Sequence, residues 1–344
     1  MSVESSKTLT VSLNAGESPL RYGRLNLERK QALQDKRVVM ATSPARPRGG
    51  RLHLRALILA AGLFVPPALA HAAGPADLYY ERTVMWAADG RCRLFTPEIG
   101  AALAASSLQA RGAALRSGVD VHDLDAAARG AAGAIAKISC AGPELAIAAD
   151  RVRKAFAGYA RIGAMTFPGE LSAWQADRHP VAPVVNGKPV EGPRWRLSQA
   201  GRWEGAGSGP VRFGLAGASA APAVADGAPG GASASSAFLI LRDPAKAGEP
   251  YIDPRRHDLA GRAPPADITR TLIAAAREAA PASLLPGGRG MLFAFPAAAA
   301  HALEALDPRE VVVVEFVYPD RPSQRALFEV GDFAAGRAFL SAGR

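Results

Sequence analysis

The chain is poor in cysteine and in aromatic side chains, with two cysteines and 6% Phe, Trp and Tyr among its 344 residues. Cys92 and Cys140 form no CxxC pair and have no histidine nearby in the sequence, which argues against a zinc site, a redox motif and a catalytic thiol. GxSxG, SxxK, HExxH and Walker motifs are also missing. We therefore predict no cofactor and no metal site, and the enzyme classes that these motifs mark are excluded.

An excess of positive charge is also missing over most of the chain, although the formal net charge of the whole chain is +10. Residues 1–72 hold eleven of the 41 Lys and Arg residues but only four of the 31 Asp and Glu residues. The remaining chain is close to neutral and has no basic patch of the kind that follows a phosphate backbone. We expect no nucleic-acid partner.

A segment with the composition of a secretory signal is present, but it lies about fifty residues into the chain. Four arginines lead into the apolar run 56–65, Pro66 and Pro67 end that run, and the small residues of 68–72 offer a signal peptidase site. This order of charged, apolar and small residues is what export requires. The run is too short to span a bilayer, so we expect no permanent transmembrane helix after cleavage.

Translation from Met40 is the simplest explanation for this position, because the signal then has an ordinary length. Residues 1–39 become a non-native leader from a misassigned start, and residues 40–72 become the signal peptide. The alternative is a buried apolar helix of a cytosolic protein. We expect the mature protein to be periplasmic or secreted.

Residues 73–164 repeat apolar side chains at helical spacing and predict an antiparallel helical bundle. The sequence Thr96-Pro97-Glu98, the acids from Asp120 onward and the sequence Gly142-Pro143-Glu144 mark three helix starts. Because two antiparallel helices return the chain to its starting end, Cys92 and Cys140 are expected to form a disulfide. Two unpaired buried thiols, or a redox or metal pair, are the alternatives. The small-residue stripes of these helices also allow a homodimer.

Residues 165–344 predict a small β-rich α+β domain with antiparallel pairing. Residues 217–236 have no side chain larger than Val and predict a flexible loop, while residues 267–279 predict a helix. The overall fold class is thus α+β: a disulfide-stapled antiparallel helical bundle followed by a β-rich domain with flanking helices. The expected strands are 195–197, 211–215, 237–242, 291–295, 310–318 and 325–330, and a closing helix is expected after Asp332.

The densest polar cluster outside the signal region is the loop YIDPRRHD, residues 251–258. Asp253, His257 and Asp258 are candidates for acid–base catalysis, and Arg255 and Arg256 are candidates for binding an anion. A proline-initiated turn held by local ion pairs explains the same residues and is the alternative.

Two further groups have a functional and a structural interpretation. Trp195 and Trp203, with arginines beside them, are candidates for an aromatic and basic surface that binds a glycan, or else they are strand residues packed against the helical half. His122, Asp123 and Asp125 could form a metal cluster, but capping of a helix explains the two acids without a metal.

The end of the chain resembles the C-terminal part of invasion-associated locus B proteins. The stretches MLFAFPAAAAHALEALDPREVVVVEF and FEVGDFAAGRAFL match a strand, an alanine-rich turn or helix, a valine-rich strand and an "sL-x-GF-x-A" ending. The resemblance covers residues 290–344 and implies an exported bacterial protein of β-rich fold without assigned catalytic residues. This chain departs from the family in having no cysteine in that half and in its helical half.

These observations predict an exported envelope protein with a non-enzymatic binding or structural role. Its partner is expected to be another envelope protein, a glycan or a second copy of the chain. The alternative is a hydrolase or transferase centred on residues 251–258.

Overall fold

The computed structural model describes residues 74–205, 207–227, 233–253, 255, 257–285 and 290–342. Residues 72–344 form one compact unit. The expected leader 1–39 and signal peptide 40–72 lie outside the described residues, as does Arg256. In the described ranges, no helix combines the length and apolar character needed to cross a membrane.

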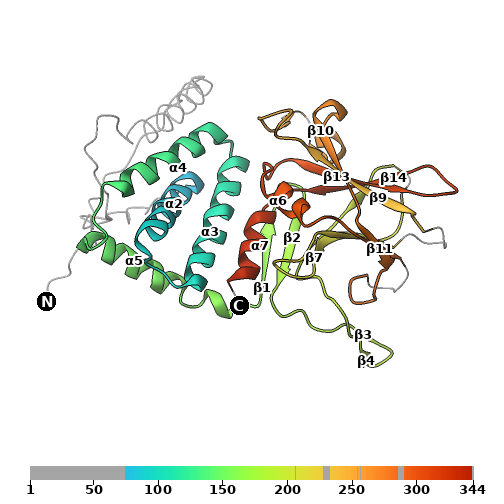
Figure 1. Cartoon of the computed structure of the whole chain (residues 1–344), viewed down its shortest axis with the longest axis horizontal. Coiled ribbons are helices and arrows are strands. Elements are labelled where there is room, and N and C mark those ends of the chain that lie inside the picture. Colours follow the sequence, from blue (N-terminus) through green and yellow to red (C-terminus); the bar gives the residue numbers. More distant parts are fainter. Residues whose placement is uncertain are drawn as a thin grey trace, which may run out of the picture. The chain divides into compact units, whose positions relative to one another are not determined.

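Four helices open the described chain (Figure 1): α2 (Pro75–Cys92), α3 (Pro97–Arg116), α4 (Val121–Ala136) and α5 (Pro143–Phe156). Their starts confirm the sequence signals, because Thr96, Asp120 and Gly142 are the N-cap residues of α3, α4 and α5. The Asp120 carboxylate accepts a hydrogen bond from the His122 backbone N–H, which satisfies one of the unpaired donors at the start of α4.

The helices enclose two small apolar cores. One gathers around Tyr79 and Leu124 between α2, α3 and α4, and the other joins Ala88, Ile135 and Leu145 of α2, α4 and α5. Next to the second core, Cys92 and Cys140 form a disulfide with a Cα–Cα distance of 5.5 Å, which confirms the predicted pairing. The covalent link holds the end of α2 to the segment between α4 and α5.

The rest of the chain forms antiparallel sheets, as predicted. The five-stranded sheet has the order β10 (Thr269–Ile273), β9 (Ser236–Arg242), β13 (Val311–Val317), β14 (Gln324–Glu329) and β6 (Arg202–Trp203). The seven-stranded sheet has the order β1 (Ala164–Pro168), β2 (Ala173–Asp177), β5 (Leu197–Ala200), β7 (Val211–Leu215), β8 (Ala223–Asp226), β12 (Met291–Ala294) and β11 (Ala276–Ala279).

The two large sheets face each other across one apolar core. Phe213 of β7 lies 5.3 Å from Phe328 of β14 between ring centroids, and Phe293 of β12 lies 5.7 Å from Phe316 of β13. Each pair joins the two sheets, and all four rings are fully buried. In a β-sandwich, the core is formed by the alternate residues of each strand that face inward.

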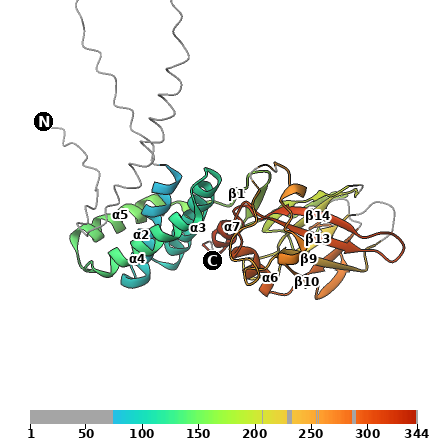
Figure 2. The same ribbon diagram turned by 90° about the horizontal axis from the view of Figure 1, so that it is seen from above.

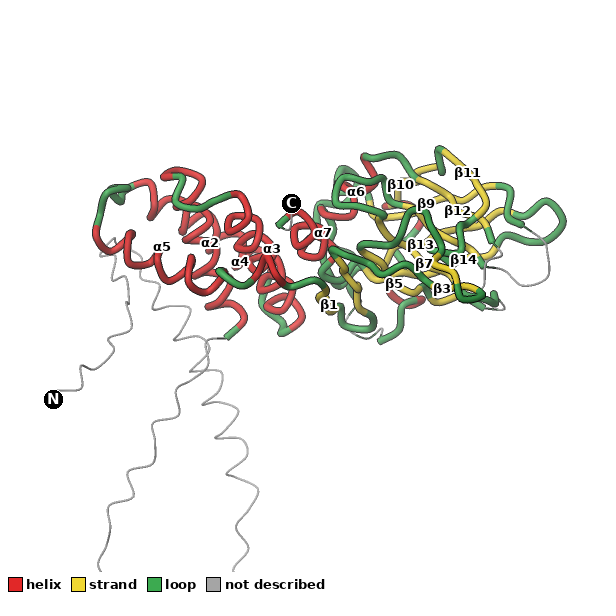
Figure 3. Tube along the Cα trace, turned by 90° about the horizontal axis from the view of Figure 1, so that it is seen from below, coloured by secondary structure: helices red, strands yellow, loops and turns green. Residues whose placement is uncertain are grey.

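The final helix α7 (Phe333–Ser341) joins the helices to the sandwich. It contacts α3 as well as β1, β2 and β5, and it lies between α3 and the strands in Figures 2 and 3. The buried Arg178 links α7 to the segment before β1. Its guanidinium donates to the Phe339 C=O of α7 at 2.7 and 2.9 Å, and to the Tyr159 C=O before β1 at 2.8 Å.

Two sequence expectations in this half are wrong. Residues 267–279 form β10 and β11 with a short 3-10 turn (η3, Ala266–Ile268) before them, not a helix. The Ala-rich sequence favours a helix, but β9 and β12 provide pairing partners that outweigh this local preference. The expected loop 217–236 contains β8, whose small side chains are buried between β7 and β12.

Candidate functional site

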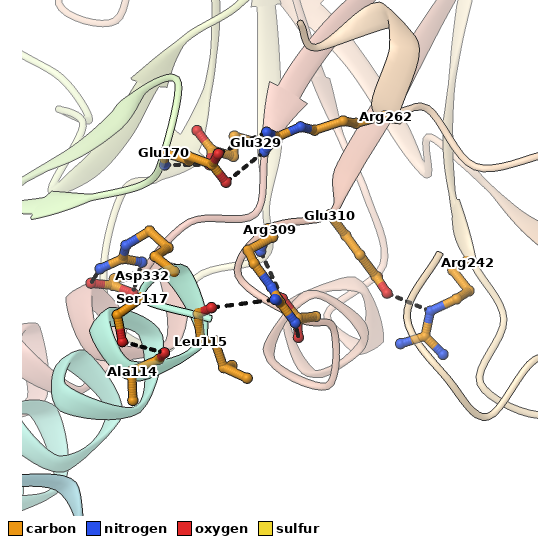
Figure 4. A network of polar contacts seen from close by, with 12 residues as sticks. Ala114, Leu115, Ser117, Glu170, Arg242, Arg262, Arg309, Glu310, Glu329 and Asp332 are labelled. Carbon is orange, nitrogen blue, oxygen red and sulfur yellow. Dashed lines mark hydrogen bonds and ion pairs between the residues drawn. The ribbon is translucent and has the colours of Figure 1, made fainter. Parts of the chain in front are cut away.

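The densest network of charged residues lies where the strand ends meet α3 and α7 (Figure 4). At its centre is Glu329, the last residue of β14, whose side chain is fully buried. Its carboxylate accepts hydrogen bonds from the backbone N–H groups of Glu170, Leu171 and Ser172 at 2.5, 2.8 and 2.7 Å. The Ser172 hydroxyl donates a fourth bond at 3.0 Å. These four donors compensate for the loss of water around the buried charge.

Glu170 and Arg262 form the part of this network that reaches the surface. The Arg262 guanidinium donates two hydrogen bonds to the Glu170 carboxylate, at 2.8 and 2.9 Å. Arg262 is buried, whereas the Glu170 side chain is 41% exposed. The hydrogen bonds from Arg262 lower the pKa of Glu170, and the charges of Arg309 and His257 add to this effect.

A second ion pair joins the helices to the sandwich. Arg116, at the end of α3, donates to both carboxylate oxygens of Asp332 at 2.8 and 3.0 Å. Burial raises the pKa of Asp332, and the Arg116 charge opposes that shift. Asp332 is the N-cap residue of α7 but makes no side-chain capping bond, because Arg116 holds its carboxylate. Nearby, Arg309 pairs with Asp307 and donates to the Leu115 C=O at 3.3 Å.

Arg242 and Glu310 form the most deeply buried pair. The Arg242 Nε–H donates to Glu310 Oε1 at 2.6 Å, and both side chains are 4% exposed. Glu310 Oε2 is buried and has no hydrogen-bond partner among the described residues. Burial raises the pKa of Glu310 to about 7, because the single bond from Arg242 does not compensate for the lost hydration.

A cavity of about 40 Å³ lies beside this network, lined by residues of α3, α6 (Ala298–Glu304) and the start of α7. Arg111, Glu304 and Asp332 contribute polar groups to its wall. The volume is enough for a water molecule but is far below the several hundred Å³ of a typical small-molecule site. The network therefore has the properties of a structural junction.

Of the described residues in the loop 251–258, Arg255, His257 and Asp258 are exposed, and none of the described residues of this loop lines the cavity. Asp253 accepts from the Arg255 backbone N–H at 2.9 Å, and Asp258 accepts from the Gly261 N–H at 2.6 Å. Such short-range hydrogen bonds from an Asp side chain to the backbone are typical of a turn. His257 is exposed, and its charge contributes to the lowered pKa of Glu170, a residue from a distant segment.

Trp195 lies in the segment before β5, whereas Trp203 lies in β6 of the five-stranded sheet. The two rings pack into different apolar clusters and do not form one surface. The Trp195 ring is buried, and its Nε1–H donates to the Leu284 C=O at 2.6 Å. Trp203, in β6, donates to the Gly209 C=O at 2.8 Å and packs on Phe316. The alternative, strand residues packed against the helical half, is also wrong, because both rings pack within the β-rich half.

His122, Asp123 and Asp125 lie in the first turns of α4, where Asp125 pairs with Arg111 at 3.4 Å. His122 lies 3.5 Å from Glu249. The described residues contain no group of three or more His, Cys, Asp or Glu side chains that could hold a metal ion.

The feature that the sequence analysis missed is a short exposed hairpin between β2 and β5, formed by β3 (Val184–Val185) and β4 (Lys188–Pro189). Asn186 and Gly187 both have positive φ, 52° and 76°, as a two-residue hairpin turn requires. Val181 is 87% exposed and Val184 is 65% exposed, and Figure 1 shows β3 and β4 extending beyond the larger sheets. The signal was the Asn-Gly pair directly after Val184 and Val185.

No known protein family, curated protein or solved structure matches this chain.

Proposed function

We propose that this is an exported envelope protein that acts by binding another protein through the β3–β4 hairpin. The observation that carries this proposal is the exposure of Val181 and Val184 at 87% and 65%. Apolar side chains so exposed on a projecting element gain free energy when a partner covers them.

The chemistry of the hairpin favours a protein partner. Beside its Asn186-Gly187 turn the hairpin exposes the apolar side chains of Val184 and Pro189, and glycan sites instead need aromatic faces and convergent hydrogen-bond donors. Lys188 and Glu191 are the charged residues of the hairpin, so it also has no basic cluster of the kind that binds anionic lipids. An apolar protein surface fits best.

The charged network supports a binding role over a catalytic one. Glu329, Asp332 and Glu170 are each held by several donors or a bidentate arginine, which stabilises the junction of α3, α7 and the strands. The Cys92–Cys140 disulfide supports export, because such bonds persist in oxidising compartments. The resemblance of residues 290–344 to invasion-associated locus B proteins is in keeping with the same location.

Site-specific photo-crosslinking in the native host tests this proposal. A photoreactive residue at position 184 should give one discrete product, and Val181→Asp in the same chain should abolish it. The matched control carries the photoreactive residue at Glu249, an exposed position whose side chain is 81% accessible. A product of equal yield from position 249, or no product from position 184, would contradict a binding role for the hairpin.

A hydrolase or transferase centred on residues 251–258 is the second candidate, because the charge of His257 contributes to the lowered pKa of Glu170, which comes from a distant segment. It predicts a hydrolytic or transfer activity in the purified protein that His257→Ala and Glu170→Gln both abolish. An activity that survives both substitutions contradicts this candidate.

A further inference from the structure

Residues 269–279 form an exposed edge that runs along both large sheets. β10 is the edge strand of the five-stranded sheet and β11 is the edge strand of the seven-stranded sheet. The chain passes from one to the other through Ala274 and Ala275. Thr271, Ile273 and all four residues of β11 are exposed. Within the described ranges, no strand pairs with the outer side of either one.

The hydrogen-bond pattern identifies which backbone groups face outward. The Asp243 N–H donates to the Ile268 C=O, and the Ala274 N–H donates to the Ala237 C=O. Because the bonding direction alternates along an antiparallel strand, the N–H and C=O groups of Thr271 point away from β9. The Ala280 N–H donates to the Gly290 C=O directly before β12. By the same alternation, the backbone N–H and C=O groups of Arg277 point away from β12.

Two charged side chains on this edge lack a partner. Neither Arg270 in β10 nor Glu278 in β11 forms a side-chain hydrogen bond or ion pair with another described residue, and the Arg270 Nε is buried without an acceptor. Charges on edge strands normally discourage pairing with other chains. Here the two charges have opposite signs, and each lies four positions from Ala274 along the sequence.

We propose that this edge pairs antiparallel with the same edge of a second copy of the chain, around a two-fold axis at Ala274. In that register Thr271 lies opposite Arg277 of the second copy, so two residues with outward backbone groups meet and exchange hydrogen bonds. Arg270 lies opposite Glu278 of the second copy, and the two-fold axis repeats this pair.

The self-complementary register is the reason to assign a second copy to this edge. A one-residue shift would place outward backbone groups against inward ones and would separate the two opposite charges. At the axis, the small side chains of Ala274, Ala275 and Ala276 allow two backbones to approach closely. Each five-stranded sheet then continues into the seven-stranded sheet of the other copy.

Sedimentation equilibrium of the protein in the micromolar range tests this pairing. The wild-type chain should be a dimer. Arg270→Glu and Glu278→Arg should each raise the dissociation constant by about tenfold, because two symmetry-related pairs change from attraction to repulsion. The double variant R270E/E278R restores opposite charges and should dimerise like the wild type.

Thr271→Pro removes an outward N–H without disturbing the bonds to β9, and should give a monomer with unchanged circular dichroism. Thr271→Val is its control and should remain a dimer. A monomeric wild type, a dimer that persists in Thr271→Pro, or a double variant that fails to recover would each overturn the proposal. Val181→Asp should still dimerise, which separates this edge from the hairpin.

Discussion

Loss of the Cys92–Cys140 disulfide should destabilise the helical half by about 4 kcal/mol. The bond closes a loop with a sequence separation of 48. In the chain-entropy model, a loop of this length removes enough freedom from the unfolded chain to contribute about 4 kcal/mol to the free energy of unfolding. The two cores that the helices enclose are small, so the covalent link is a large part of their stability.

Urea unfolding followed by far-ultraviolet circular dichroism measures this effect. The double variant C92A/C140A and each single variant should lose a similar free energy of unfolding, because each one removes the same bond. Reduction of the wild type with a small thiol is the matched control, since it keeps both sulfur atoms and so preserves the packing of Cys92 beside Ile135 and Leu145. A loss below about 1 kcal/mol after reduction would refute the loop-closure reasoning.

Two further predictions concern the network. Gly112→Ala should destabilise the protein by about 2 kcal/mol or more, because a Cβ there would overlap the Asp332 carboxylate; Gly130→Ala, where a Cβ meets no atom within 4 Å, should instead stabilise it by about 0.5–1 kcal/mol, and thermal unfolding that shows equal effects contradicts this close approach. Because burial raises the pKa of Glu310 to about 7, its protonated form contributes stability that is complete below the pKa of the unfolded chain and lost as the pH rises through about 7. The free energy of unfolding of Glu310→Gln relative to that of the wild type should therefore rise between about pH 5 and about pH 8, a range that contains this pKa. A constant difference across that range would refute the assignment.

The start signals of the helices were readable from the sequence because they depend on neighbouring residues. Thr96, Asp120 and Gly142 precede their helices directly as N-cap residues, and Asp120 also accepts a capping hydrogen bond with its side chain. The disulfide was predictable for the same reason, since short links between antiparallel helices fix where the chain returns. Strand β7 likewise has the bounds that its apolar run predicts.

The errors arose where distant residues decide the structure. Residues 269–279 have a helical composition, yet β9 and β12 pair with them as strands. The charged network was missed because its members lie far apart in the chain, with a sequence separation of 216 between Arg116 and Asp332. A single sequence places no such pair together, whereas the polar loop 251–258 attracted attention because its charges are adjacent.

We propose that this protein acts outside the cytoplasm as a disulfide-bonded binding protein. The most direct test is the N-terminal sequence and intact non-reduced mass of the chain from each fraction of its native host. We predict a mature chain that begins near His71 or Ala73 in the envelope or the medium, lighter than its reduced form by two hydrogens because Cys92 and Cys140 are bonded. A chain that begins at Met1 in the cytosol with two free thiols would contradict the account.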